Sequence, residues 1–308
     1  MNDLRHHSQD YLTVRRTLGY KLVGEGLLLA DFVTFVEKTG ACAVTIDLAV
    51  AWTTKTATGS AAYLARRMRV ARSFARYLHT LDPTTEIPPA DLFPAGKHRP
   101  VPYIYSDDDV AALIAAARTL VPPLRAATFV ALLGLLRATG MRSSEAMALD
   151  RGDIDWPDCA LTVRDSKYGK SREVLVHPST LAALDAYRRQ RDRLAPSRCA
   201  LSFFVSTRGT RLCHETIQPT FRRLLRQAGL QQPASSPQPH LHGLRHTFAV
   251  DTLVGWYRDG GDVAVRMPLL STYLGHVDPA ATYWYLSAIP ELLALAANRL
   301  EPASGEPS

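Results

Sequence analysis

The first third of the chain has a helical pattern of hydrophobic and polar positions. The pattern is strongest over residues 27–36 and 61–79. In the second segment, apolar residues recur about every 3.6 positions and so share one face. These residues are Leu64, Met68, Ala71, Ala75 and Leu78. We therefore predict two helices here, the second of them amphipathic.

The other face of the segment 61–79 is basic. It carries Arg66, Arg69, Arg72 and Arg76. The ordinary interpretation of such a face is a solvated helix surface. However, no acidic residue occurs between Asp47 and Asp82, so the segment has no carboxylate of its own to neutralise the arginines. This excess of one charge favours contact with phosphate groups.

A proline-rich stretch follows. Prolines stand at positions 83, 88, 89, 94, 100 and 102. Because proline fixes φ and cannot continue a helix, this stretch is expected to be an extended linker. Two basic residues, Lys97 and Arg99, lie inside it and suggest a strap along a polyanion.

The pattern after the linker predicts helices with a small sheet inserted. Ser106 with Asp109 three residues later indicates a capped helix from 107 to about 120, and a second helix runs from about 126 to 138. Three short β-rich runs follow at 160–164, 172–176 and 202–205. The first two flank a glycine-containing loop and so predict an antiparallel hairpin. From Leu181 onward the pattern is again mainly helical.

Two later features complete the prediction for this part of the chain. Gly260 and Gly261 predict a surface turn, and Met267 with Pro268 predicts the start of a fresh helix, since proline favours the first turn. Residues 290–300 form a final apolar helical segment. The fold class expected is therefore mainly α with a small antiparallel β-sheet.

Composition and charge narrow the class of protein. The 308 residues allow two domains, and 46% hydrophobic with 21% charged residues excludes a mainly disordered chain. The longest mostly apolar run, 126–136, is too short to cross a bilayer. The four cysteines form no CxxC pair, which fits a cytoplasmic protein without a zinc ribbon. A net charge of +7 points weakly to a polyanionic partner.

Four short segments carry candidate chemistry. They are Thr139-Gly140-Met141-Arg142-Ser143-Ser144-Glu145, Ser166-Lys167-Tyr168-Gly169-Lys170-Ser171-Arg172, His242-Gly243-Leu244-Arg245-His246, and Leu274-Gly275-His276 followed by Tyr285. Each has an ordinary structural explanation when taken alone: a salt bridge, a solvated loop, a helix start or a core aromatic group. Their order and spacing together resemble the tyrosine recombinase (phage integrase) family over about residues 105–295.

The chemistry of a phosphodiester explains why such residues belong together. Attack on the phosphate adds negative charge to its oxygens, and positioned cations stabilise that charge. Arg142 and Arg245 suit this role because a guanidinium offers a planar fork of donors. His276 would donate a further hydrogen bond to a non-bridging oxygen.

Proton transfer requires further groups. A tyrosine hydroxyl has a reference pKa of about 10 and needs a base, for which His242 is the best placed. Lys167 can protonate the departing 5′ oxygen as general acid. Glu145 lies one helical turn after Arg142 and is expected to orient that arginine or the neighbouring histidine.

The resemblance implies a reaction and a nucleophile. Tyr285, nine residues after His276, would attack the scissile phosphate, form a 3′-phosphotyrosyl link and free a 5′-hydroxyl. A 5′-hydroxyl from a partner strand would then attack this link and rejoin the DNA. Tyr283 is the competing nucleophile, although it falls two residues short of the family spacing, and Tyr273 precedes the Leu274-Gly275-His276 motif. Lys170 is the alternative to Lys167 as the acid, and it is expected, with Arg172, to contact DNA.

The resemblance also implies domains and partners. Residues 1–90 would form a helical core-binding domain, 91–104 a basic linker, 105–300 the catalytic domain and 301–308 a flexible tail. The partner would be a double-stranded recombination site, bound by a homo- or hetero-tetramer of related recombinases. No metal, ATP, other cofactor or membrane is implied, and a nucleoid-associated cytoplasmic protein of a mobile element is expected. The final helix would dock on a neighbouring protomer or pack on its own domain.

Three other functions are compatible with parts of this pattern. His240, His242 and His246 are close enough in sequence to suggest zinc, although no HExxH motif is present. A DNA-binding protein without catalysis would not need the full set of catalytic-type residues. A relaxing topoisomerase would use the same tyrosine chemistry, but the size, the linker and the final helix favour a recombinase.

Overall fold

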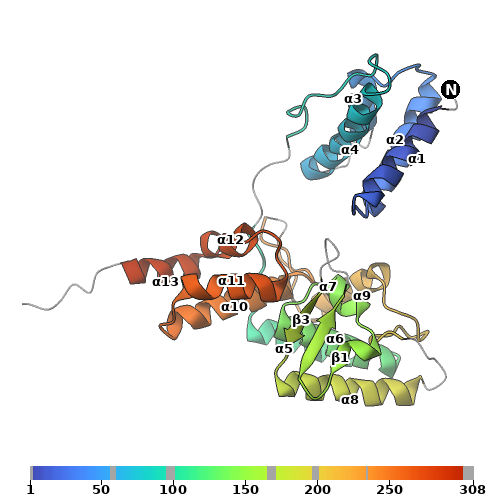
Figure 1. Ribbon diagram of the computed structural model, residues 1–308. Helices are drawn as coiled ribbons and strands as arrows, with labels where there is room; N and C mark the ends of the chain where they lie inside the picture. The colour runs from blue at the N-terminus through green and yellow to red at the C-terminus, as the bar shows by residue number, and fades with distance from the viewer. Residues whose placement is uncertain are drawn as a thin grey trace, which may run out of the picture. The chain divides into compact units, whose positions relative to one another are not determined.

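The computed structural model describes residues 3–55, 60–94, 101–164, 171–195, 201–233 and 235–300. The chain divides into two compact units, Met1–Arg99 and Pro100–Ser308 (Figure 1). Among the described residues, no helix combines the length and the apolar character that crossing a membrane would require.

The first unit is a small helical bundle. Its helices are α1 (Asp3–Thr17), α2 (Val23–Thr39), α3 (Ile46–Thr54) and α4 (Ala61–His79). Both helices predicted for this region are confirmed, as α2 and α4, and Ser60 caps α4 by accepting a hydrogen bond from the backbone N–H of Tyr63. The apolar faces meet around the buried rings of Phe32, Trp52 and Phe74.

The second unit is mainly helical with a three-stranded sheet, the predicted fold class. Its helical elements are α5 (Asp107–Arg118), α6 (Pro123–Thr139), α7 (Ser143–Ala148), the 3-10 turn η1 (Arg151–Asp153), α8 (Pro178–Leu194), α9 (His214–Gln227), α10 (Gly243–Arg258), α11 (Val263–Leu274), α12 (Ala280–Ala288) and α13 (Pro290–Leu300). The strands are β1 (Ile154–Asp155), β2 (Ala160–Val163) and β3 (Arg172–Leu175).

The sheet is antiparallel in the order β1-β2-β3. Strands β2 and β3 pair with Leu161 opposite Val174, which confirms the predicted hairpin. The strand predicted over 202–205 is wrong. Only isolated bridges occur there, between Asp150 and Ser202 and between Val205 and Arg211, because this segment turns back on itself after two buried phenylalanines.

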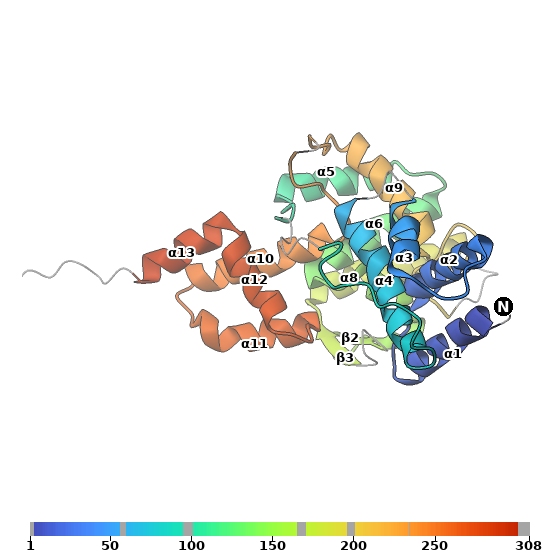
Figure 2. The same cartoon turned by 90° about the horizontal axis from the view of Figure 1, so that it is seen from above.

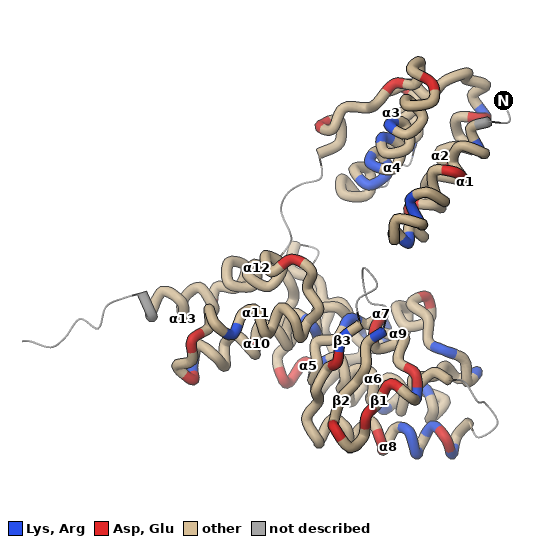
Figure 3. Tube along the Cα trace, in the orientation of Figure 1, with Lys and Arg blue, Asp and Glu red and all other residues tan. Residues whose placement is uncertain are grey.

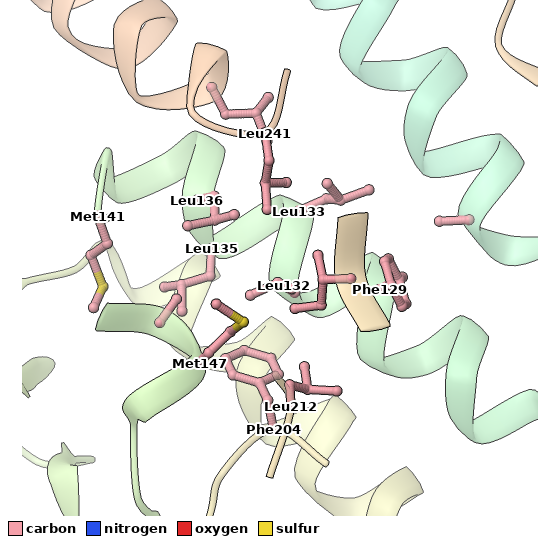
Figure 4. Close-up of a cluster of buried hydrophobic side chains, with 14 of the residues drawn as sticks. Phe129, Leu132, Leu133, Leu135, Leu136, Met141, Met147, Phe204, Leu212 and Leu241 are labelled. Atoms are coloured by element: carbon pink, nitrogen blue, oxygen red, sulfur yellow. The ribbon is translucent and has the colours of Figure 1, made fainter. Parts of the chain in front are cut away.

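Helix α6 is the centre of the second unit. It packs against α5, α8 and α10 and is apolar on nearly every side. Figure 4 shows its side chains, Leu132 and Leu135 among them, gathered in one cluster with Met147 of α7 and Phe204 from a later segment. A helix buried on several faces is well suited to fix its own C-terminal end, where the first candidate motif begins.

The last four helices form a group of their own. Helices α10 to α13 share an apolar cluster that includes Leu253, Met267, Leu270 and Leu292, and they lie together in both views of the ribbon (Figure 2). Helix α13 packs against α10 and α12 of the same chain. Of the two placements considered for this helix, the single chain adopts the one on its own domain.

The predicted start of the helix α11 is wrong. Proline 268 lies inside the helix, which begins at Val263. The side chain of Asp262 accepts hydrogen bonds from the backbone N–H groups of Ala264 and Val265, and this cap fixes an earlier start than the proline suggests. The predicted turn just before it is confirmed, with Gly260 at a φ of 76°.

Gly140 ends α6 in the left-handed region, at a φ of 59°. A Cβ added there would lie 2.5 Å from Cδ1 of Phe248 and 3.1 Å from Cδ2 of Leu274. We therefore expect Gly140→Ala to lower the free energy of unfolding by about 2 kcal/mol, from strain and overpacking together.

Gly134, inside the same helix, is the matched control. An added Cβ there meets nothing within 4 Å. Gly134→Ala should raise the free energy of unfolding by roughly 0.5–1 kcal/mol, since alanine restricts the unfolded chain. Denaturant titration of both variants decides the matter, and equal effects at the two positions would contradict the role given to Gly140.

Candidate active site

Arg142 lies where the first motif leaves α6. Gly140 stops that helix, and Arg142 takes an extended backbone conformation as the residue before α7. Its Nη1 donates to Oε1 of Glu145 over 2.6 Å, and its Nη2 donates to the backbone oxygen of Gly275 over 2.7 Å. The arginine of the first motif is thus joined to the glycine of the Leu274-Gly275-His276 motif.

Arg245 is held beside it. It projects from the first turn of α10 and is buried. Its Nη1 donates to the backbone oxygen of Gly140 over 2.9 Å, and its Nη2 to that of Leu274 over 2.8 Å. Burial, together with the nearby charge of Arg142, lowers the pKa of Arg245 to about 10, so the guanidinium still carries its charge at neutral pH.

Glu145 is the buried anion of the cluster. It accepts from the backbone N–H and Nη1 of Arg142 at 2.9 and 2.6 Å, and from Nη1 and Nη2 of Arg172 at 3.0 and 2.9 Å. Burial by itself raises the pKa of Glu145, but the hydrogen bonds from Arg172 and Arg142 outweigh it and bring the pKa to about 2. Glu145 therefore binds Arg142, one of the two partners expected for it.

Arg172 has a different position from the one its sequence suggests. We expected a DNA contact, but its side chain is only 13% exposed and its guanidinium faces Glu145. Its Nε also donates to the backbone oxygen of Tyr273 over 2.9 Å. A Cβ on Gly275, which has a φ of 70°, would lie 2.8 Å from Nη1 of Arg172. The glycine is therefore required both by the backbone and by this close approach.

The two histidines of the motifs are anchored differently. Nδ1 of His276 lies 2.6 Å from Oγ1 of Thr282, a buried residue of α12, so this histidine is tied to the helix that carries Tyr285. His242 precedes α10, and its ring meets the ring of His246 edge-on, with the centroids 4.7 Å apart.

The three tyrosines near the site differ in their surroundings. Tyr285 is 1% exposed, and its hydroxyl lies 2.8 Å from Nδ1 of His246. Tyr283, the competing nucleophile, is 47% exposed. Tyr273 donates its hydroxyl to the backbone oxygen of Leu175, and burial raises the pKa of Tyr273 to about 12. Of the three, the structure places Tyr285 within the electrostatic influence of Arg245.

Some predicted residues lie outside the described part of the chain. They are Lys167, Lys170, Lys97 and Arg99, together with the predicted tail 301–308. The zinc interpretation of His240, His242 and His246 receives no support. Within the described ranges, no three side chains of histidine, cysteine or acid converge in a way that could hold a metal ion.

The basic face of α4 is partly neutralised by its neighbours (Figure 3). Arg66 forms an ion pair with Glu25 of α2 at 2.8 Å, and Arg72 donates to the backbone oxygen of Pro88 over 2.8 Å. Arg69 and Arg76 are exposed. The absence of acids between Asp47 and Asp82 left out the carboxylate of Glu25, which α2 contributes from earlier in the chain.

A second basic surface was missed altogether. Helix α9 buries Phe221 and Leu224, and its outer face carries the exposed residues Arg222, Arg223 and Arg226. The signal is visible in the sequence, where arginines alternate with apolar residues at helical spacing over 221–226.

Comparison with known proteins agrees with this geometry. Residues 104–291 match the Phage integrase family. A Sinorhizobium fredii protein named "Putative integrase/recombinase y4rB" is 41% identical over 307 residues, which cover 98% of each chain. The tyrosine recombinase XerC of Alcanivorax borkumensis is 29% identical over 71% of this chain and 67% of its own length.

Solved structures give the same fold. XerA recombinase has a TM-score of 0.52 at 25% identity, covering 98% of this chain and 99% of that one. The Tn1549 transposon integrase (residues 82–397), solved with circular intermediate DNA, has a TM-score of 0.67 at 17% identity, covering 96% and 99%. The chain belongs to the phage integrase family. It is a tyrosine recombinase, a member of the class of enzymes that cleave and rejoin DNA.

The low pKa of Glu145 predicts a pH-dependent contribution to stability. The folded pKa of Glu145, about 2, lies below the ordinary glutamate value of 4.5, so the stabilisation is complete above pH 4.5 and is lost as the pH falls towards 2. Glu145→Gln should therefore lower the free energy of unfolding at pH 7 by about 3 kcal/mol and flatten the acid limb of the stability profile.

Glu173→Gln serves as the control, because Glu173 is an exposed carboxylate on the neighbouring strand β3. It should change the free energy of unfolding by less than about 0.5 kcal/mol. Urea titrations between pH 2 and 7 compare the two variants. An unaltered acid limb in Glu145→Gln would contradict the ion-pair network.

Proposed function

We propose that this chain is a site-specific recombinase that cuts and rejoins DNA through a 3′-phosphotyrosyl intermediate formed on Tyr285. The observation that carries the proposal is the convergence of Arg142 and Arg245 on Gly140 and Leu274-Gly275, beside the helix that bears the tyrosine. Two fixed guanidinium groups next to a phenol suit phosphoryl transfer, in which catalysis consists mostly of positioning and charge stabilisation.

The pocket binds the scissile phosphate through its cations. Arg142 and Arg245 receive the non-bridging oxygens, whose negative charge grows as the nucleophile approaches. His276 donates a further hydrogen bond to one of them. Because these groups are held by backbone carbonyls and by Glu145 before DNA arrives, little reorganisation is needed during the reaction.

The chemical step exchanges one phosphate ester for another. The Tyr285 oxygen forms a bond to phosphorus while the bond from phosphorus to the 5′ oxygen breaks. His242 accepts the phenolic proton, and Lys167 gives a proton to the departing 5′ oxygen. A 5′-hydroxyl from the partner strand then attacks the phosphotyrosine, which restores the diester and the tyrosine. Bond energy is kept in the covalent link throughout.

The resting position of Tyr285 requires a movement before attack. Its ring is 1% exposed, so a phosphate cannot reach the hydroxyl until α12 or the groups covering it shift. His276 is attached to α12 through Thr282, and binding of the phosphate by His276 would therefore act directly on this helix. We infer that DNA binding triggers the movement.

The partners follow from the same proposal. The substrate is a double-stranded recombination site, held by the catalytic unit and by the helical first unit as a core-binding domain. Support comes from the DNA-bound structure of the Tn1549 integrase and from the integrase naming of y4rB. Recombination of two duplexes requires four protomers, and integration or excision of a mobile element at the nucleoid is the role that fits.

The nucleophile is tested by Tyr285→Phe. This variant should bind DNA normally and form no covalent complex, because only the attacking oxygen is removed. The assay uses nicked duplexes that tile the DNA ends flanking the coding sequence and trap the cut strand on denaturing gels. Tyr283→Phe, two residues away, should form the adduct as wild type does. Adduct persisting in Tyr285→Phe would move the nucleophile elsewhere.

The role of α4 in DNA binding is tested with its exposed arginines. Changing Arg69 and Arg76 together to Gln should weaken binding and lower the slope of log K against log salt by about 2, one phosphate contact for each residue. Arg66→Gln is the control, since Arg66 is paired with Glu25 and should change the slope less. Equal slopes for wild type and the double variant would remove this helix from the DNA interface.

A further inference from the structure

A buried histidine that the proposed mechanism does not use contacts the nucleophile. The Nδ1 atom of His246 lies 2.8 Å from the hydroxyl oxygen of Tyr285, and the two rings meet nearly edge-on with centroids 5.6 Å apart. Both residues are buried, at 5% and 1% exposure. This contact joins α10, which carries Arg245 and follows His242, to α12, which carries the tyrosine.

The environment makes this hydrogen bond consequential. The ring of Tyr285 belongs to the apolar cluster of α10 to α13, which also includes Leu253 and Met267. A phenolic hydroxyl buried among apolar side chains needs a hydrogen-bond partner, because leaving it unsatisfied costs about 1–3 kcal/mol. The imidazole nitrogen therefore selects the orientations of the tyrosine side chain that keep the hydroxyl directed at α10.

The position of His246 on α10 places this contact beside other candidate site residues. It follows Arg245 immediately and stands one turn after His242, whose ring packs edge-on against it. Arg245 in turn is fixed by two backbone carbonyls. A hydroxyl bound to His246 is therefore held against the helix that also carries Arg245.

We propose that His246 is a positioning residue for the nucleophile, which holds the Tyr285 hydroxyl against α10, the helix that also carries Arg245. The proposal rests on the function proposed above. Holding a reacting oxygen in one place removes part of the entropic cost of attack, and a misplacement of about 1 Å can cost on the order of 100-fold in rate. The hydrogen bond thus reduces the number of conformations that the tyrosine side chain samples once DNA binding exposes it.

Three substitutions separate positioning from packing. His246→Phe keeps a ring of similar size without the nitrogen, His246→Asn places an amide group near the position of Nδ1, and His246→Gln places it near Nε2. His240→Asn is the matched control, because His240 belongs to the same group of histidine rings, is exposed, and has its ring 6.0 Å from that of His246. Melting temperatures establish that each full-length variant is folded.

The readouts are the dissociation constant for the nicked duplexes and the first-order rate of covalent adduct formation at saturating protein. His246→Phe should form adduct at least about ten-fold more slowly, with the dissociation constant unchanged within about two-fold. His246→Asn should recover most of the rate, whereas His246→Gln should not. His240→Asn should match wild type.

Contrary results are equally distinct. A wild-type rate, or a faster one, in His246→Phe would overturn the proposal. Equal loss in the Phe, Asn and Gln variants would assign His246 to packing alone and also overturn it. Should His246→Phe fail to fold, the comparison of Asn with Gln still decides. Failure of the wild-type protein to form any adduct would instead refute the proposed function.

Discussion

The active-site architecture depends on one buried carboxylate held between two guanidinium groups. Glu145 binds Arg142, which also donates to the backbone of Gly275, and Arg172, the first residue of β3. Three arginines, at positions 142, 172 and 245, are gathered in this region and would repel one another without a counter-charge. Burial strengthens the attraction as well as the repulsion, so a single well-bonded anion decides whether the arginines are held together before DNA is present.

The C-terminal ends of two helices provide further negative charge that stabilises the arginines. Helix α6 ends at Gly140 and α11 ends at Gly275, both in the left-handed region. The backbone oxygens of Gly140, Leu274 and Gly275 accept hydrogen bonds from Arg142 or Arg245. The C-terminal end of a helix carries partial negative charge, so two helix ends and one carboxylate together hold the cations in place. At the proposed phosphate site, the positions of the charges are therefore already set.

Much of this was predictable from the sequence, because its signals are local. The helix 61–79, the hairpin 160–176 and the spacing of the motifs each depend on residues close together in the chain. What failed depends on contacts between distant elements. In the sequence Arg172 belongs to a basic loop segment, whereas in the fold it forms an ion pair with Glu145. Arg66 has no acidic neighbour in the sequence, whereas in the fold it pairs with Glu25 of α2. The sequence suggested His246 only as a possible zinc ligand beside Arg245, since only the fold brings α12 against it.

The central claim is that the oxygen of Tyr285 becomes esterified to DNA. Wild-type protein trapped on the nicked duplexes can be digested with nuclease and trypsin, and the peptide spanning residues 267–299 analysed by tandem mass spectrometry. This peptide contains Tyr273, Tyr283 and Tyr285, so fragment masses distinguish the three. The account predicts a nucleotide attached through its 3′ phosphate to Tyr285. A nucleotide on another residue, or no adduct at all, would contradict it.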